Sequence, residues 1–240
     1  MHTTNFMQIF LNNKIKLRAF IVAIVASVSL SSCLDNSGPD SSSIVSAVSV
    51  IHASPNSPGF EFVVDNQRVE RFSYGDNYIP YFVAYSGNRY ARVYEQGSFN
   101  RPLYEFELRL INGKYYSVFI TGDKDDLSSL ILEDDLTSPG ENAHVRFVNV
   151  SPDAPALDFS VTNDSTLASN KKYKEYTSFQ VVTPGTYNAL VKSHGSEDIV
   201  FNEEIQFKAG QIYTVWAKGF VETEIEDQAF GVSVIRHVID

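Results

Sequence analysis

The chain has 240 residues and a formal net charge of −10 at pH 7, from 29 acidic and 19 basic residues. An acidic surface repels phosphate backbones, so the composition argues against a nucleic-acid partner. The single cysteine excludes an internal disulfide and any zinc cluster built on cysteine ligands.

The first 32 residues are typical of a secretory signal peptide. A basic segment without acidic residues precedes residues 19–30, which are almost all apolar. This apolar run is shorter than the roughly 20 residues that a transmembrane helix needs. We therefore expect the segment to be cleaved. A signal anchor that stays in place is the alternative, and either Met1 or Met7 starts the chain.

The residues around Cys33 resemble a bacterial lipobox, in which an aliphatic residue and two small residues precede the cysteine. The sequence here is Leu30-Ser31-Ser32-Cys33. The resemblance implies cleavage before Cys33, a diacylglyceryl thioether on its sulfur, and acylation of its new amino group, for example with palmitate. Three acyl chains make a stable anchor, whereas one chain is marginal.

These features predict an extracytoplasmic, membrane-anchored lipoprotein, which we expect in the outer membrane of a Gram-negative bacterium. Its first partner is the lipid bilayer, contacted through the acyl chains on Cys33. Loss of residues 1–32 removes three basic residues and no acidic one, which takes the formal charge to −13. Residues 33–43 are small, polar and turn-forming, so we expect a flexible tether. Both a periplasmic and a surface-exposed orientation are open.

One stretch of the mature chain occurs twice, 97 residues apart. An apolar run, Ser-Pro-x-x-Pro and an alternating run are typical of a strand, a stiff corner and a second strand. The corner residues of the two copies are His52, Ser54, Pro55 and Pro58, and Asn149, Ser151, Pro152 and Pro155. A later block, Gly-x-x-Tyr-[Ser/Thr]-Val, begins at Gly113 and again at Gly210. The repeated order of these blocks indicates an internal duplication.

The first copy, residues 44–135, contains short runs of β-branched and aromatic residues between turn formers. Strands are expected at residues 48–52, 60–64, 78–85, 89–95, 105–110, 115–121 and 128–132. Pro80 predicts an edge strand or a bulge, and Asn112-Gly113 is a strong hairpin signal.

A short junction rich in turn formers, residues 136–143, leads to the second copy, residues 144–240. Its strands are expected at residues 144–150, 157–161, 179–182, 187–192, 203–207, 213–218 and 230–238, with a solvated loop at residues 170–172. No stretch of the mature chain has a convincing helical period. We therefore predict an all-β fold of two tandem antiparallel β-sandwiches, immunoglobulin- or transthyretin-like, that have seven or eight strands each and fold separately.

The corner and the Gly-x-x-Tyr block resemble domain of unknown function family 4397. The resemblance covers about residues 45–135 and 144–238, and the second copy fits better than the first, which departs at Asn56, Ser57 and Glu61. It implies a β-sandwich at an extracytoplasmic address. It implies no activity and no catalytic residues.

The residues themselves do not suggest chemistry. His52 and its counterpart Asn149 are expected to hydrogen-bond the backbone of the corner, and Ser54 and Ser151 to tie the corner to nearby backbone amides. No histidine lies at a metal-ligand spacing, and no nucleophile elbow or phosphate loop is present. The acidic loop at residues 123–126 lacks the glycine of a calcium loop. We predict no catalytic residue, no metal and no cofactor.

Nine of the thirteen tyrosines lie in the first copy, and tyrosine is common both in strands and on recognition surfaces. Alternate residues of a strand share a face, so Tyr90, Arg92 and Tyr94 lie on one side. Arginine is rarely buried unpaired, so this side is expected to face outward. If the turn at residues 86–88 makes hairpin neighbours, Tyr81 or Tyr85 joins the same outer face.

The function predicted from these features is a non-catalytic binding or adhesion module of the cell envelope, with a protein or a glycan as partner. The alternatives are a structural spacer or assembly subunit and, more remotely, a hydrolase acting on envelope polymers. An exposed aromatic patch would favour binding, a large apolar patch a structural role, and a deep pocket with convergent acids an enzyme.

Overall fold

The structure is a computed structural model that describes residues 44–240 except 76–77, 162–164, 197 and 239–240. Residues 44–240 form one compact unit. The predicted signal peptide, Cys33 and the tether lie outside the described residues. No helix in the described part of the chain has the length and apolar character to cross a membrane.

The fold is all β, as the sequence predicts, and each repeat contributes eight strands. In chain order they are β1 (Val45–Ala53), β2 (Phe60–Val64), β3 (Gln67–Phe72), β4 (Tyr78–Tyr85), β5 (Gly87–Glu95), β6 (Tyr104–Leu110), β7 (Tyr115–Asp123), β8 (Asp126–Asp134), β9 (Ala143–Asn149), β10 (Leu157–Val161), β11 (Ser165–Lys171), β12 (Gln180–Val182), β13 (Gly185–Ser193), β14 (Ile199–Phe207), β15 (Ile212–Lys218) and β16 (Gly231–His237). A single turn of 3-10 helix, η1 (Glu226–Gln228), precedes β16.

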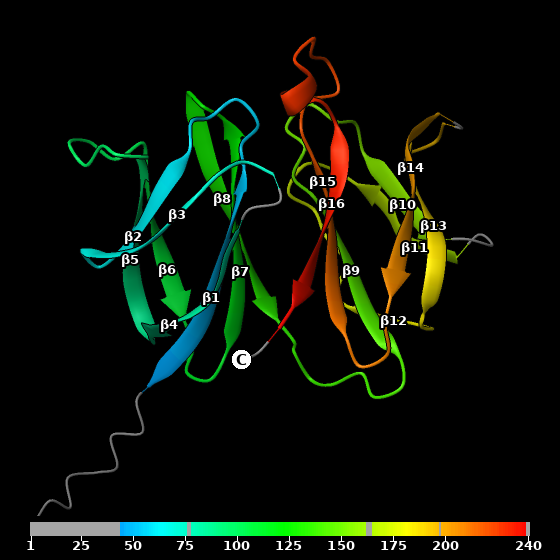
Figure 1. Cartoon of the computed structure of the whole chain (residues 1–240), viewed down its shortest axis with the longest axis horizontal. Coiled ribbons are helices and arrows are strands. Elements are labelled where there is room, and N and C mark those ends of the chain that lie inside the picture. The colour runs from blue at the N-terminus through cyan, green and yellow to red at the C-terminus, as the bar shows by residue number, and fades with distance from the viewer. Residues whose placement is uncertain (1–43, 76–77, 162–164, 197, 239–240) are drawn as a thin grey trace, which may run out of the picture. The chain divides into compact units, whose positions relative to one another are not determined.

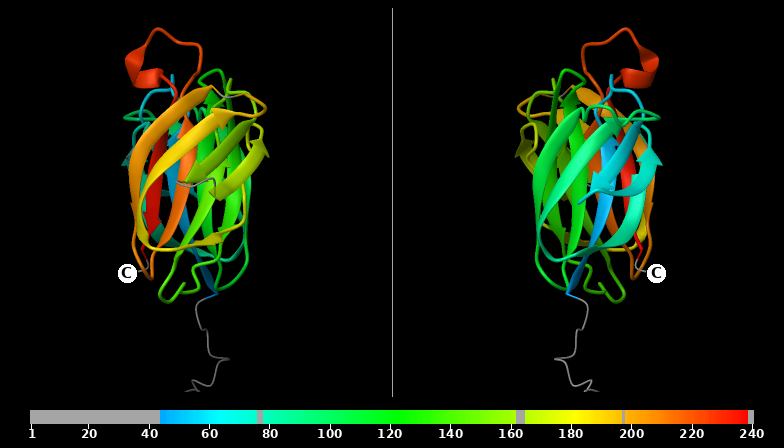
Figure 2. Two further views of the ribbon diagram at one scale, coloured as in Figure 1. Left: turned by 90° about the vertical axis from the view of Figure 1, so that its right-hand side faces the viewer. Right: turned by 90° about the vertical axis from the view of Figure 1, so that its left-hand side faces the viewer.

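The strands form four four-stranded sheets, two in each sandwich (Figure 1). In the first sandwich the outer sheet has the order β3-β2-β5-β6 and the inner sheet β4-β1-β7-β8. In the second, the outer sheet is β11-β10-β13-β14 and the inner sheet β12-β9-β15-β16. Figure 2 shows the outer sheet of the second sandwich in one view and that of the first in the other. The strand orders of the two sandwiches correspond one to one, which confirms the tandem arrangement.

One strand pair in each sandwich differs from the antiparallel expectation. β1 pairs with β7 in parallel, and β9 pairs with β15 in parallel, while the other pairs are antiparallel. The corner after β1 sends the chain to the outer sheet, so the partner of β1 comes from much later in the chain. β4 is an edge strand, as Pro80 predicts, and its pairing with β1 is interrupted by a bulge at Val48 and Val50.

Two strands were not predicted from the sequence. β3 and β11 are edge strands of the outer sheets, and β11 runs through part of the predicted loop at residues 170–172. β3 has the sequence QRVERF and is mostly exposed. Charged residues on an edge strand discourage pairing with other chains, and they also remove the apolar alternation by which a strand is recognised.

Each sandwich has its own core, and a third core joins them. Phe60 and Phe62 lie in the first core, and Phe147 and Phe159 in the second. The third core lies between the two inner sheets and contains Ile51, Ala53, Phe119 and Leu132 from the first repeat and Val148, Val150, Trp216 and Ile235 from the second. The inner sheets are therefore buried on both faces, and the separate folding of the two units stays a prediction.

Equivalent residues of the two repeats meet in this third core. Ile51 corresponds to Val148 and Phe119 to Trp216 at the 97-residue spacing. The rings of Phe119 and Trp216 contact each other edge to face at 5.6 Å. We call this contact between the inner sheets the repeat interface.

Candidate functional site

The repeated corner is built by hydrogen bonds that recur in both copies. The Ser54 amide donates to Nδ1 of His52 at 3.4 Å, and the Ser151 amide donates to Oδ1 of Asn149 at 3.1 Å. Nε2 of His52 then donates to the carbonyl of Pro58 at 2.9 Å, which requires the Nε2-H tautomer. The predicted role of His52 and Asn149 in holding the backbone of the corner agrees with these contacts.

In each copy the corner serine bonds to the carbonyl of an equivalent glycine, and this partner differs from the one expected. The Ser54 hydroxyl donates to the carbonyl of Gly122 at 2.7 Å, and the Ser151 hydroxyl donates to the carbonyl of Gly219 at 2.6 Å. The expectation of bonds to backbone amides is wrong, because each buried hydroxyl lies beside a carbonyl that needs a donor. Both serines are fully buried, so the corner is structural and offers no reactive group.

At Asn56 the first copy departs from the family pattern, but the side chain has the same role as Asp153 in the second copy. The Asn56 side chain accepts a hydrogen bond from the Lys124 amide at 3.0 Å. Asp153, 97 residues later, accepts from the Val221 amide at 2.8 Å. A side-chain oxygen at this position therefore joins each corner to the loop that follows the strand beside it.

The outer sheet of the first sandwich carries the predicted tyrosine row. Tyr90, Arg92 and Tyr94 lie on the solvent side of β5, while Ala91 and Val93 are fully buried in the core. The orientation expected from the position of Arg92 is the one found. Tyr90 is 40 % exposed.

Ion pairing and ring contacts order this row. The Arg92 guanidinium lies over the Tyr90 ring at 4.8 Å and donates to Glu105 at 2.9 Å and to Asn66 at 2.9 Å. The Tyr90 hydroxyl also donates to Glu105, and this bond raises the pKa of the phenol. Tyr90 and Arg92 are thereby held in fixed positions before any ligand arrives.

The loop between β5 and β6 extends the row. The ring of Phe99, which is 46 % exposed, contacts the Tyr94 ring at 5.3 Å, and the Arg68 guanidinium lies 4.6 Å from the centre of the Phe99 ring. We call Arg68, Phe99, Tyr94, Arg92 and Tyr90 the arginine–aromatic band. Sequence reasoning missed Arg68 and Phe99, because they lie on an unpredicted strand and in a loop.

A buried carboxylate lies beneath one end of the band. Glu61 is fully buried and is paired with Arg68 and, at 3.0 Å, with Arg71. The Gly97 amide donates to it at 2.9 Å. Burial alone would raise the pKa of Glu61, but the Gly97 amide and the two arginines hold it below its ordinary value. The carboxylate is therefore a fixed counter-ion that positions Arg68.

The outer sheet of the second sandwich has no equivalent of the band among its described residues. The positions that match Tyr90, Arg92 and Tyr94 at the 98-residue offset of this segment are Asn188, Leu190 and Lys192. Asp158 matches Glu61 and is paired with His194 at 3.0 Å instead of with arginines. Two copies of one scaffold therefore present different outer faces.

Tyr81 and Tyr85 do not join the band, so that expectation is wrong. β4 pairs with β1 in the inner sheet, whereas β5 lies between β2 and β6 in the outer sheet. The residues between them take the chain from one sheet to the other, and Gly87 adopts a φ of +103° at this point. Tyr85 is 67 % exposed at the edge of the inner sheet, and Tyr81 points into the repeat interface.

Tyr81 belongs to a polar cluster in the repeat interface. Its hydroxyl donates to Asp134 at 2.6 Å and accepts from Nδ1 of His237 at 2.8 Å. Nε2 of His237 then accepts from the Thr214 hydroxyl at 2.7 Å. Burial and the nearby Asp134 raise the pKa of Tyr81, while burial lowers the pKa of His237 to about 4.

An ion pair completes this cluster. Arg146 and Asp134 are 2 % and 3 % exposed, and their charged groups approach to 2.6 Å across the interface. Arg146 also donates to Thr214 at 2.8 Å, and Asp134 accepts from Ser117 at 2.8 Å. The cluster is satisfied by its own members, so its geometry is that of a structural network between the repeats.

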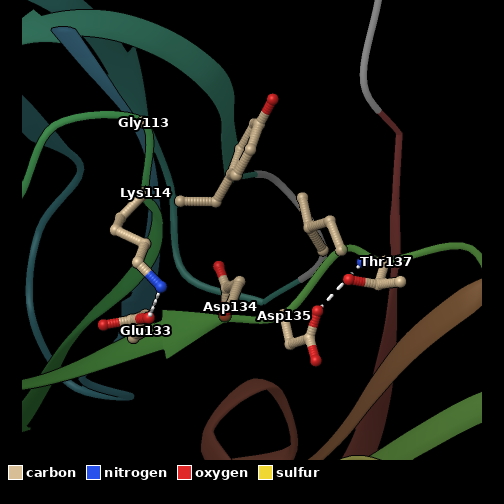
Figure 3. Close-up of a pocket in the computed structure, with 8 residues that line it drawn as sticks. Gly113, Lys114, Glu133, Asp134, Asp135 and Thr137 are labelled. Carbon is tan, nitrogen blue, oxygen red and sulfur yellow. Dashed lines mark hydrogen bonds and ion pairs between the residues drawn. The ribbon is translucent and has the colours of Figure 1, made fainter.

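Two hollows border this cluster. A pocket of about 490 Å³ is lined by residues 113–115 and 133–137. Figure 3 shows Lys114 paired with Glu133, at 2.7 Å, and Asp135 bound to Thr137, whose amide donates at 3.0 Å. A second pocket, of about 50 Å³, lies beside Tyr81. Because the charged groups of the larger pocket are engaged with neighbours, it presents no free acid–base pair.

No group of three or more His, Cys, Asp or Glu side chains in the described segments is arranged to hold a metal ion. The acidic loop at residues 123–126 is the hairpin end between β7 and β8. There Asp123 accepts hydrogen bonds from the Asp125 amide and the Asn56 side chain, which hold the pKa of its carboxyl below the ordinary value.

The solved structures that match this chain include two proteins of limited similarity. The TIE protein of Bacillus anthracis is 13 % identical, with 73 % of this chain and 34 % of that chain covered and a TM-score of 0.25. This chain thus spans about a third of its length. CBMbc, a family CBM26 module from Eubacterium rectale Amy13K solved with maltoheptaose, is 6 % identical, with coverages of 82 % and 98 % and a TM-score of 0.26. TM-scores this low assign neither fold nor ligand.

A search among curated proteins found no significant match. A family model does match, over residues 46–160 and again over residues 143–235, and its description is Domain of unknown function (DUF4397). The two matches include both corners and nearly all of the described residues. The chain therefore belongs to the DUF4397 family, of which it carries two tandem copies.

Proposed function

We propose that the protein is a cell-envelope lipoprotein that acts as a non-catalytic binding module. Acyl chains on Cys33 hold it to the membrane, and the arginine–aromatic band of the first sandwich receives the partner. The observation that carries the proposal is the difference between the two outer sheets. Among the described residues, β5 of the first sandwich combines aromatic rings with guanidinium groups, and the corresponding strand β13 of the second sandwich does not.

The band has the properties of a recognition surface. Its rings are partly exposed, and tyrosine and arginine are enriched where proteins bind partners. Guanidinium and phenol groups donate hydrogen bonds, while the ring faces offer apolar contact. These groups suit the hydroxyls and flat faces of an envelope glycan, or a protein surface with exposed acidic groups.

The ion pairs of the band favour binding without large rearrangement. Arg92 is fixed by Glu105, and Arg68 by Glu61, so little side-chain entropy is lost when a partner docks. The net acidic charge of the chain disfavours nucleic acid and anionic lipid as partners.

Changing Tyr90, Arg92 and Tyr94 together to serine is expected to abolish binding to the partner and to leave folding nearly intact. The removed contacts are exposed, and exposed ion pairs contribute about 0–1 kcal/mol to stability. Binding is measured against purified envelope polysaccharides and solubilised envelope proteins, and stability by thermal melting.

The matched control is the same triple change at Asn188, Leu190 and Lys192 on the second sandwich, which should retain binding. Equal loss of binding in both variants would show that the arginine–aromatic band is not the binding surface. A large fall in melting temperature for the first variant alone would show that its side chains serve the core.

Replacing Cys33 with serine is expected to abolish acylation, because the thioether cannot form without the sulfur. The variant should also keep its signal peptide, since the lipobox cut depends on the cysteine. Fractionation and apparent mass are the measurements. A variant that stays in the membrane fraction at the processed size would contradict the lipid anchor.

A further inference from the structure

Exposed apolar side chains gather where the chain enters the first sandwich. Among the described residues, six large apolar side chains are more than half exposed. Four of them surround the start of β1, namely Ile44, Val83, Tyr85 and Ile111, with exposed fractions of 61, 72, 67 and 55 %. We call these four residues the entry rim.

Hydrogen bonds bring the segments of the entry rim together. The carbonyl of Ile44 accepts from the amide of Ser86, the residue after Tyr85, at 2.9 Å. The hydroxyl of Ser46 donates to the carbonyl of Ile111 at 2.7 Å. Three separate parts of the chain therefore meet at the end of the sandwich where β1 begins (Figure 1).

We propose that the entry rim rests on the lipid bilayer that holds Cys33. This inference depends on the lipid anchor proposed above. Residues 33–43 number eleven, and at about 3.3–3.6 Å per residue they span at most about 40 Å. The covalent anchor reaches the fold at Ile44, and the other residues of the rim lie around this point.

The chemistry of the rim fits the surface of a bilayer. Tyrosine is enriched at the membrane–water boundary, and exposed aliphatic side chains gain by entering the acyl region. The formal charge of −13 offers no general attraction to anionic lipid, so apolar contact is the interaction available. The rim orients the molecule on the membrane, and the opposite end, with the loop between β15 and β16, points away (Figure 1).

The loop at that opposite end supplies a matched control. Ile225 is 55 % exposed, the same fraction as Ile111. It lies between the end of β15 and η1. The two isoleucines therefore differ in position and not in exposure.

The test uses the lipidated full chain in vesicles of phosphatidylethanolamine and phosphatidylglycerol with brominated acyl chains. The sulfur of Cys33 is acylated, so an introduced cysteine is the one free thiol. Ile111→Cys and Ile225→Cys are each labelled with an environment-sensitive fluorophore. Brominated lipid should quench the label at residue 111 several-fold more than the label at residue 225, and Val83→Cys should behave like Ile111→Cys.

Equal quenching at residues 111 and 225 would overturn the proposal. A label at residue 111 that is shielded from aqueous iodide but not quenched by brominated lipid would also overturn it, because a protein then covers the rim. Protein that fails to float with the vesicles would instead overturn the lipid anchor itself. The failure of the rim contact and the failure of the anchor are therefore distinguishable.

Discussion

Replacing Arg146 with alanine is expected to lower the free energy of unfolding by about 3–5 kcal/mol, because it leaves the buried carboxylate of Asp134 without its cation. The two charged groups lie 2.6 Å apart in the repeat interface and are almost completely buried. Asp134 would retain only the hydroxyls of Tyr81 and Ser117. Chemical denaturation of the full mature chain measures the effect.

A second ion pair close by in the chain is the control. Lys114 and Glu133 approach to 2.7 Å, but their side chains are 49 % and 47 % exposed. Lys114→Ala should therefore cost at most about 1 kcal/mol. The double variant Arg146→Ala, Asp134→Ala should lose less than the sum of its single changes. A loss of under about 1 kcal/mol for Arg146→Ala would show that the pair does not hold the repeats together.

Acidification is expected to destabilise the fold between about pH 6.5 and pH 4 through two buried histidines. Burial lowers the pKa of His52 and of His237 to about 4, from an ordinary value of 6.5. The unfolded chain therefore takes up protons first as the pH falls, so the stability that is present above pH 6.5 is lost toward pH 4. Each histidine accounts for on the order of 3 kcal/mol over this range.

The second corner suggests the variant that tests this pH dependence. Asn149 performs the task of His52 in the second corner without a titrating group. His52→Asn should keep the bond from the Ser54 amide and remove about half of the pH dependence, at a modest cost at pH 7.5 from the lost bond to Pro58. Melting temperatures from pH 7.5 to pH 4 are compared for the two proteins. If the melting temperature of the variant fell with pH as steeply as that of the unchanged protein, His52 would not titrate in this range.

Much of the fold could be predicted from the sequence, because the two copies of the repeat can be compared with each other. The two corners, the hairpin at Asn112-Gly113 and the alternation around Arg92 follow from local rules of turn and strand geometry. The edge strand β3 escapes these rules, because its sequence QRVERF is that of a charged edge.

The repeat interface was not predicted, although the sequence carries a signal for it. β7 contains the continuous apolar run Val118-Phe119-Ile120, which is typical of a strand buried on both faces. Arg146 and Asp134 work against this signal, because a charged residue in a strand usually marks a solvent face. Only the packing of the two inner sheets against each other shows that Arg146 and Asp134 are partners.

The arginine–aromatic band could be predicted only in part from the sequence. The outward direction of Tyr90 follows from the strand period, but Phe99 lies in a loop and Arg68 on an unrecognised strand. The separation of Tyr85 from the band depends on a change of sheet at Gly87, and a turn between two strands of alternating residues does not reveal whether they pair.

The repeat interface joins two descendants of one surface, and its polar residues have diverged in a complementary way. Strand register makes Ser117 the equivalent of Thr214, and Asp134 the equivalent of His237. Two first repeats from different chains would place a second Asp134 at the position of His237 without a cation, and two second repeats would place His237 instead of Asp134 opposite Arg146, without a carboxylate. Each inner sheet is thus matched to the other repeat and mismatched to itself, which favours closure within one chain over self-association between chains.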